Sequence, residues 1–262
     1  MPPADDPATI YETELVPAMF RPWAEVLVDF VRPRPGERVL DAACGTGVVA
    51  RRVVPLVGPS GETVGLDFDP AMIAMAARIA PDIAWRQGDL QSLPFADEEF
   101  DLVLCQQGLQ FLRDREAGMK QIHRVLRPGG RVALAVWTDL AKSPGQAALL
   151  GALGELLGES MGRPAAWSLS DGAQLEKLVA AAGFVDIETK IASLPSRYAS
   201  ARRFVEILLD GSSKVTREAL AQLPTERKAA FIDDVVRRLR DYETSAGLEF
   251  PMESRLLLAR KR

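Results

Sequence analysis

The sequence has few of the side chains that proteins use for metal binding and covalent cross-linking. Its 262 residues include one histidine, two cysteines and no asparagine. One histidine and two cysteines are too few for a histidine-rich or cysteine-rich metal site. Two thiols in a chain of this length also exclude a disulfide scaffold and suit a reducing cytosol. Without asparagine there is no acceptor for N-glycosylation.

Excess charge and long apolar runs are also missing. The 36 acidic and 32 basic residues give a formal charge of −4. A nucleic-acid partner is therefore not expected, because such a surface needs a strong positive field. No apolar run approaches the roughly 18 residues of a membrane span. Residues 1–7 carry acids and prolines instead of the basic start of a targeting signal. We therefore expect a cytoplasmic protein.

Strand-like and helix-like segments alternate along the first half of the chain. Short apolar segments are followed by 10–15-residue helical patterns, which is typical of parallel strands joined by crossover helices. The expected strands are 38–42, 62–66, 83–86, 100–105, 131–137, 184–194 and 252–260. The sequence thus predicts a doubly wound, mostly parallel α/β sheet of seven strands, with ligands at the carboxyl ends of its strands.

The remaining segments are predicted to be helical and to belong to the same domain. We expect a single domain over 1–262. Residues 1–35 form an N-terminal helical cover, 36–137 a cofactor-binding core, and 138–262 a C-terminal half. That half contains a helical insertion at about 195–250, before the last strand, which would act as a lid.

The most informative motif is Gly45-x-Gly47-x-x-Ala50, which follows a predicted strand and opens a helix. Glycines there allow a tight turn and a close approach of the backbone to a ligand. Asp67 follows at the end of the second strand, where an acid accepts hydrogen bonds from ribose hydroxyls. Dinucleotides and S-adenosylmethionine both fit this arrangement. Asp41, just before the turn, would repel a pyrophosphate and attract a sulfonium and an ammonium group, which favours S-adenosylmethionine.

The chain resembles the class I S-adenosylmethionine-dependent methyltransferases, in particular the small-molecule branch with the ubiquinone/menaquinone biosynthesis type. Five segments in order and spacing carry the resemblance: Val39–Gly47, Gly65–Pro70, Gly88–Phe95, Phe100–Leu104 and Leu126–Arg131. It implies a Rossmann-like methyltransferase fold. It also implies metal-independent methyl transfer from S-adenosylmethionine to a small, fairly apolar organic acceptor by in-line displacement.

The resemblance also implies a set of cofactor-binding residues. Acids would hold the methionine end, the ribose and the adenine amino group, and small residues would form the turn. Aromatic and apolar side chains would cover the cofactor and line the adenine, and a glutamine would lie beside the methionine moiety. In chain order these are Tyr11, Phe20, Asp41, Ala43, Gly45, Gly47, Asp67, Phe68, Met72, Asp89, Leu90 and Gln106.

Several alternatives remain at this stage. His123 lies in a helix expected to pack outside the sheet, so a histidine base is disfavoured, and no other catalytic residue is assigned. An NAD(P)-dependent oxidoreductase is less well supported, because none of the three tyrosines begins a Tyr-x-x-x-Lys motif. A catalytically silent, cofactor-binding subunit also stays open, since fold alone does not establish function. The sequence leaves open the acceptor, its methylated atom, the oligomeric state and the pathway.

Overall fold

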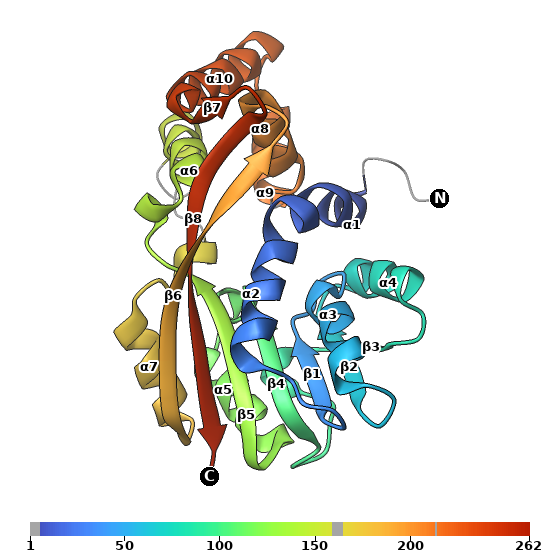
Figure 1. The fold of residues 1–262 in the computed structure, drawn as a ribbon. Coiled ribbons are helices and arrows are strands. Elements are labelled where there is room, and N and C mark those ends of the chain that lie inside the picture. Colours follow the sequence, from blue (N-terminus) through green and yellow to red (C-terminus); the bar gives the residue numbers. More distant parts are fainter. Residues whose placement is uncertain (1–5, 159–164, 213) are drawn as a thin grey trace.

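The structure is a computed structural model that describes residues 6–158, 165–212 and 214–262. Its lower half in Figure 1 is a sheet flanked by helices, and its upper half is a group of helices around the extensions of two strands. The N-terminal helices run from the upper half down along the sheet. In the described part of the chain, no helix is long and apolar enough to cross a membrane.

The helices and strands follow one another in the predicted alternation. The strands are β1 Arg38–Ala42, β2 Glu62–Asp67, β3 Ala84–Gln87, β4 Phe100–Gln106, β5 Leu126–Trp137, β6 Phe184–Tyr198, β7 Glu243–Thr244 and β8 Gly247–Lys261. The α-helices are α1 Pro7–Ile10, α2 Arg21–Val31, α3 Val48–Val57, α4 Pro70–Ile79, α5 Arg115–Val125, α6 Pro144–Leu157, α7 Gly172–Ala181, α8 Ala201–Asp210, α9 Lys214–Ala221 and α10 Thr225–Arg238. The described short helices are η1 Tyr11–Phe20, η2 Leu90–Ser92, η3 Leu109–Phe111, η4 Leu140–Lys142, η6 Ala165–Trp167 and η7 Arg240–Tyr242.

Seven of the described strands lie side by side in the order β3-β2-β1-β4-β5-β8-β6, and β7 pairs with β8 alone. The first five of these are parallel to their neighbours, and β8 runs antiparallel between β5 and β6. The chain passes from β1 to β2 on one side and later to β4 on the other. This reversal creates a crevice at the carboxyl end of β1. The predicted doubly wound, mostly parallel sheet is confirmed.

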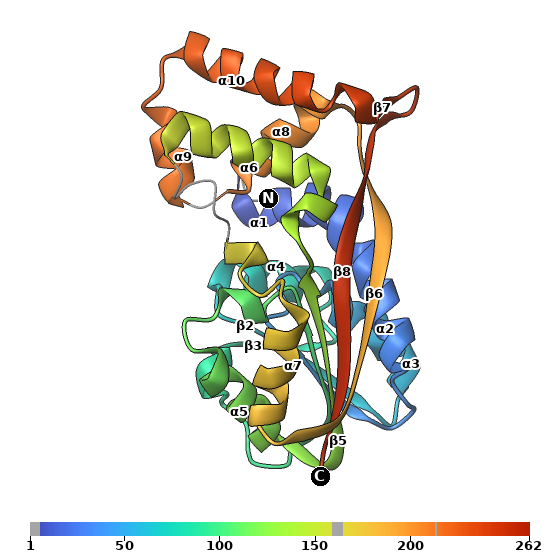
Figure 2. The ribbon, with the colours of Figure 1, turned by 90° about the vertical axis from the view of Figure 1, so that its left-hand side faces the viewer.

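Helices cover both faces of the sheet. Figure 2 shows α5 and α7 on one face and α2 and α3 on the other. Strand residues alternate between the two layers, because successive side chains point to opposite faces. Leu40 and Val103 pack with the α5 and α7 side, whereas Val39 and Leu102 pack with the α2 and α3 side. All four are fully buried, which explains the continuous apolar character of these strands.

The last two long strands extend further than the sequence indicates. We expected strands at 184–194 and 252–260, but β6 continues to Tyr198 and β8 begins at Gly247. Their extra lengths pair with each other from Pro195 with Pro251 to Tyr198 with Leu248. They carry the sheet into the upper half (Figure 1). The predicted bounds of the helical insertion, about 195–250, are correspondingly too broad, because β6 occupies the start and η7, β7 and the beginning of β8 occupy the end.

A second apolar core holds the upper helices on this two-stranded extension. Tyr198, Phe204 and Phe250 form a group of rings with centroids 4.9–5.9 Å apart. Leu149 of α6 and Val235 of α10 belong to the same buried cluster. Side chains of the N-terminal segment, including Met19 and Trp23, also take part in it. The cover, the strand extensions and the insertion therefore pack as one body above the carboxyl ends of the sheet.

Candidate active site

A cavity of about 800 Å³ lies at the carboxyl ends of β1, β2 and β4. Its volume is in the range of small-molecule sites. It is bounded below by the glycine turn and on one side by the N-terminal segment. The residues that line it are Tyr11, Phe20, Ala43, Gly45, Leu66, Asp67, Phe68, Asp69, Met72, Gly88, Asp89, Leu90, Gln91, Gln106, Gln107, Gly108, Phe111, Leu112 and Arg113.

The structure brings ten of the twelve sequence-predicted residues to this cavity and places the other two behind it. Asp41 and Gly47 lie next to the turn but do not line the cavity. The ten that do are Tyr11, Phe20, Ala43, Gly45, Asp67, Phe68, Met72, Asp89, Leu90 and Gln106.

The glycine turn is held in an unusual backbone conformation. Ala43, Gly45 and Gly47 all have positive φ angles, of 59°, 54° and 85°. The turn is tied to the neighbouring strand by the Cys44 amide, which donates to the Leu66 carbonyl at 2.9 Å. Gly47 ends the turn as the N-cap of α3. The left-handed conformation favours glycine at 45 and 47 and costs energy at Ala43.

Gly47 is needed for packing. A Cβ built on Gly47 would lie 2.1 Å from Trp85 Cη2, so no side chain fits between the turn and this ring. The Trp85 Nε1 atom donates to the Ala80 carbonyl at 2.8 Å, which fixes the ring in place. The contact between Gly47 and Trp85 could not be predicted from the sequence, because Trp85 lies in the short strand β3, far along the chain from the glycine turn.

Two carboxylates point into the cavity from successive strand ends. Asp67 accepts hydrogen bonds from the amides of Gly45 at 2.7 Å and Asp69 at 2.9 Å. Burial nevertheless raises the pKa of Asp67 above its ordinary value. Asp89 caps η2 and binds the amide of Gln91 at 2.8 Å. Gln91 Nε2 also donates to both Asp89 oxygens at 3.2 Å, which leaves a second lone pair on Asp89 Oδ2 and on each oxygen of Asp67 for a ligand.

Asp41 sits directly behind the turn. Its side chain is 1% exposed, and its Oδ2 accepts a hydrogen bond from the Ala50 amide in the first turn of α3 at 2.9 Å. A carboxylate is favoured at that position by the helix dipole. Burial has a larger effect than the hydrogen bond from the Ala50 amide, which lowers the pKa, and the pKa of Asp41 is raised to about 7. The Coulombic effect of Asp67 raises it further, so the two acids form one electrostatic group.

The N-terminal segment supplies an aromatic wall. The rings of Tyr11 and Phe20 stack with centroids 4.9 Å apart. Burial, followed by the charges of Asp67 and Asp41, raises the pKa of Tyr11, so its hydroxyl stays protonated. Gln106 is 8% exposed and donates from Nε2 to the Phe20 carbonyl at 3.0 Å. Its Oε1 atom is buried without a hydrogen-bond partner, which leaves an acceptor available at the cavity wall.

A chain of buried polar groups supports the other end of the cavity. Gln110 donates to Gln107 at 2.8 Å, Gln107 donates to Ser254 at 3.1 Å, and Ser254 donates to the Val136 carbonyl at 2.9 Å. Ser254 lies on β8, far along the sequence from the two glutamines, and no local sequence pattern connects them. These hydrogen bonds fix the backbone after β4, where Gln107 adopts a positive φ of 54°.

His123 lies at the opposite end of the sheet. It belongs to α5, and its ring contacts Phe184 with a centroid distance of 5.1 Å. Phe184 pairs with Lys261 at the end of β8, beside the amino end of β5. Burial and then the charge of Lys261 lower the pKa of His123. A role in proton transfer at the cavity is not compatible with this position.

Replacement of His123 by glutamine is therefore expected to leave the rate of catalytic turnover within about twofold of the unmodified protein, whereas removal of a general base costs roughly 10²–10⁴-fold. The pH–rate profile should also be unchanged. Initial rates measured between pH 6 and 9 test this expectation. A loss of more than tenfold, or the disappearance of a limb of the profile, would show that the histidine does take part.

The cavity fits S-adenosylmethionine by its shape and by its donor and acceptor groups. It offers carboxylates, the unpartnered Gln106 oxygen and apolar walls, and Arg113 is the one cation among its lining residues. A cofactor with an ammonium, a sulfonium and ribose hydroxyls matches these acceptors, whereas a pyrophosphate would be repelled. Among the residues that the structure describes, no group of three or more His, Cys, Asp or Glu side chains is arranged to hold a metal ion.

Part of the chain is similar to known methyltransferases. Residues 39–130 match the family described as "Methyltransferase domain". The demethylmenaquinone methyltransferase of Beutenbergia cavernae is 39% identical over 129 residues, which are 49% of this chain and 52% of the relative. The 2-phytyl-1,4-naphtoquinone methyltransferase of Synechococcus elongatus is 34% identical over 139 residues, 50% of this chain and 60% of the relative. The chain thus spans a little over half the length of these curated relatives.

A solved methyltransferase structure has a similar fold at lower sequence identity. Phosphoethanolamine N-methyltransferase 2 of Haemonchus contortus, solved with phosphomonomethylethanolamine and S-adenosylhomocysteine, is 19% identical and superposes with a TM-score of 0.61. The match covers 99% of this chain and 58% of that chain. At this identity it shows the fold alone.

These findings confirm the resemblance inferred from the sequence. Residues 39–130 match the methyltransferase-domain family and are similar to known methyltransferases. Within that class, the segment is similar to the quinone type. The family match covers residues 39–130 and leaves the helices of the upper half outside it.

Proposed function

We propose that the protein transfers a methyl group from S-adenosylmethionine to a small, largely apolar organic acceptor. The observation that carries this proposal is the cavity at the carboxyl ends of β1, β2 and β4, where Asp67, Asp89 and Gln106 present acceptor groups beside aromatic and apolar walls. The cofactor supplies an activated methyl group on a positively charged sulfur. The protein then mainly has to align the reacting atoms and exclude water, which contributes roughly 7–11 kcal/mol.

The cavity residues have distinct parts in this proposal. Asp67 binds the ribose hydroxyls and Asp89 the adenine amino group. The backbone amide of Leu90 lies in the first turn of η2, whose N–H groups lack partners within the helix, and it faces the adenine ring. Phe68, which is 73% exposed, and Met72 enclose that ring from the solvent side. Covering Phe68 removes an exposed aromatic surface from water, which favours binding.

The methionine end lies between the glycine turn and the N-terminal segment. Ala43, Gly45 and Gly47 shape the backbone there, and Gln106 Oε1 accepts a hydrogen bond from the cofactor's ammonium group. Asp41 acts from behind the turn through its charge. Tyr11 and Phe20 stand over the sulfonium, where the faces of aromatic rings attract a cation by about 0.5–2 kcal/mol.

The acceptor occupies the remaining part of the cavity, towards η3 and the upper helices. Phe111 and Leu112 line it with apolar surface, and Gln107 is held in place by Ser254. The relatives named for menaquinone and naphthoquinone methylation support an aromatic ring as the acceptor class. We also propose that the chain works as one domain, with the upper helices as a lid. The unbroken passage of β6 and β8 through both halves supports this.

We propose that the protein acts in the cytoplasm on a small molecule and not on a nucleic acid. Cys44 and Cys105 are both buried and unpaired, which suits a reducing compartment. The cavity is bounded by the N-terminal segment and carries several acids, which disfavours a polyanionic strand.

Turnover with a panel of acceptors tests this function. Purified protein and S-adenosylmethionine are incubated with phenols, reduced quinones and amines, and S-adenosylhomocysteine is quantified. Methylation of at least one phenol or quinol, and its loss in Asp67→Ala, is the expected result. Binding of the cofactor without methylation of any acceptor would instead favour the silent cofactor-binding subunit. Hydride transfer from NADH or NADPH would favour the oxidoreductase.

A further inference from the structure

Two neighbouring residues of the N-terminal segment meet two neighbouring residues of the glycine turn. Tyr11 lies over Gly45, where an added Cβ would come within 3.2 Å of the tyrosine hydroxyl oxygen. The next residue, Glu12, accepts a hydrogen bond from Thr46 Oγ1 on its Oε2 atom at 2.5 Å. Thr46 is fully buried, so this contact is largely shielded from solvent on the Thr46 side.

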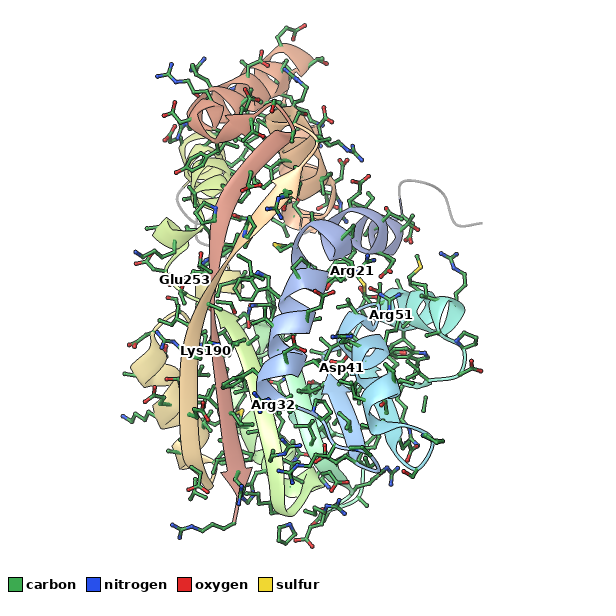
Figure 3. The ribbon with its side chains drawn as sticks, viewed as in Figure 1. Arg21, Arg32, Asp41, Arg51, Lys190 and Glu253 are labelled. Atoms are coloured by element: carbon green, nitrogen blue, oxygen red, sulfur yellow. The ribbon has the colours of Figure 1, made fainter. Side chains whose placement is uncertain are left out.

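Arg51 completes the contact from the first turns of α3. Its Nη1 and Nη2 atoms donate to Glu12 Oε1 at 2.9 and 3.0 Å, and Nη2 also reaches Oε2 at 3.2 Å. Figure 3 shows Arg51 on α3 beside the N-terminal segment. The two side chains are only 22% and 16% exposed, which makes this one of the better shielded ion pairs of the described chain. Charge-assisted, bidentate contacts of this kind fix geometry as well as energy.

The ion pair is not what holds the N-terminal segment to the protein. Further along the same segment, Leu15, Val16 and Met19 are buried in apolar clusters, and α2 continues this packing with Trp23 and Leu27. Glu12 lies before all of them. Ala8 is also buried, and Tyr11 packs at the edge of both clusters, so we expect loss of the Glu12 charge to loosen Tyr11 locally while the rest of the segment stays packed.

We propose that Glu12 is a positioning residue that holds Tyr11 over the bound cofactor, through its contacts with Thr46 and Arg51. This inference rests on the proposed function. Tyr11 forms the wall above the glycine turn, and Glu12 is covalently next to it. A fixed Glu12 therefore keeps the aromatic wall closed, and release of Glu12 opens a path for the cofactor to leave.

The rate at which S-adenosylhomocysteine dissociates tests the proposal. It is measured by surface plasmon resonance on the full-length protein and on Glu12→Gln, Arg51→Met and Tyr11→Ala. We expect Glu12→Gln and Arg51→Met each to dissociate about five- to tenfold faster than the unmodified protein. Glu12→Gln in the Tyr11→Ala background should add nothing further, because Glu12 acts through Tyr11.

Glu14→Gln is the matched control. Glu14 lies on the same helix but pairs with Arg203 of α8 at 2.6 Å, away from the glycine turn. Its dissociation rate should equal that of the unmodified protein. Unchanged rates in both Glu12→Gln and Arg51→Met, or a further acceleration by Glu12→Gln on top of Tyr11→Ala, would overturn the proposal. If the unmodified protein bound no S-adenosylhomocysteine, the proposed function itself would fail, which is a different outcome.

Discussion

Replacement of Asp41 by asparagine is expected to raise the melting temperature of the ligand-free protein at pH 8 by at least about 3 °C, and to weaken S-adenosylmethionine binding about tenfold. The two effects have one cause. The carboxylate is fully buried and its pKa is raised to about 7, so its charge destabilises the empty protein. The same charge attracts a cationic cofactor. Asparagine keeps an oxygen for the Ala50 amide and removes the charge.

The sign and the magnitude follow from the two pKa values. In the unfolded chain Asp41 ionises near its ordinary value of 3.8, and in the folded protein at about 7. The folded state therefore binds more protons between these values, and its stability falls as the pH rises from about 4 to 7. The upper limit of this loss is about 4 kcal/mol. We accordingly expect Asp41→Asn to be stabilising at pH 8 and to have no such advantage at pH 4.

The expected loss of S-adenosylmethionine affinity in Asp41→Asn can be estimated from Coulomb's law. Two unit charges about 10 Å apart at an effective dielectric constant of ~20 attract by about 1.7 kcal/mol, which is more than tenfold in Kd. Between pH 6 and 7.5 the affinity of the unmodified protein should rise as Asp41 ionises, and that of Asp41→Asn should stay flat. Thermal denaturation and calorimetry on both proteins measure the two effects.

Asp101→Asn is the control for an acid that is only 11% exposed but is paired with an arginine. Asp101 lies on β4, accepts a hydrogen bond from the Arg38 amide at 2.8 Å and forms an ion pair with Arg127. Its replacement should destabilise the protein or leave it unchanged, with no effect on cofactor binding. If Asp41→Asn lowered the melting temperature at pH 8 as well, the carboxylate would be a stabilising helix cap and the electrostatic account of this residue would be wrong.

Replacement of Gly47 by alanine is expected to destabilise the protein by roughly 3 kcal/mol or more. The residue has a φ of 85°, and a Cβ would lie 2.1 Å from the Trp85 ring, which cannot turn away without losing its contact with Ala80. Urea unfolding followed by far-UV circular dichroism measures the change. Because the glycine turn would move, cofactor affinity should fall together with stability.

Gly58→Ala is the control that separates backbone strain from the clash with Trp85. Gly58 ends the same helix with a φ of 66°, but a Cβ there would meet nothing within 4 Å. With a ψ of −171°, Gly58 lies in a region that is essentially restricted to glycine, so the replacement should cost about 1–3 kcal/mol of backbone strain and nothing from a clash. Trp85→Leu in the Gly47→Ala background should recover part of the loss by making room for the methyl group. Equal destabilisation by the two glycine replacements, with no recovery in the double variant, would remove Trp85 from the explanation.

The sheet was largely predictable because its strands are buried on both sides. A strand such as Phe100–Gln106 can be recognised from its composition, because a strand that is covered on both faces needs a nearly continuous run of apolar residues. The extensions of β6 and β8 were not predictable in the same way. In β6 the residues from Glu188 to Leu194 are exposed or half-buried, so no continuous apolar run marks where the strand ends. Pairing between the two strands, which lie some 50 residues apart, determines their length.

The site shows the same division. The glycine turn, Asp67 and Asp89 lie at strand ends within a local pattern, and the sequence brought them together correctly. Asp41 belongs to the same pattern, yet its place behind the turn depends on the helix that follows. Glu12, Trp85 and Ser254 reach the site from other segments, with partners 34, 38 and 147 residues away in the chain. No spacing rule encodes such contacts, because folding alone brings them together.

The most direct test of the central claim is a calorimetric titration of the unmodified protein with S-adenosylmethionine, repeated with S-adenosylhomocysteine, NAD and the variant Asp67→Ala. We expect one site per chain with a Kd at or below about 100 μM for S-adenosylmethionine and its product, at least tenfold weaker binding in Asp67→Ala, and no binding of NAD. Absence of S-adenosylmethionine binding up to about 1 mM, or binding of NAD at that site, would contradict the account.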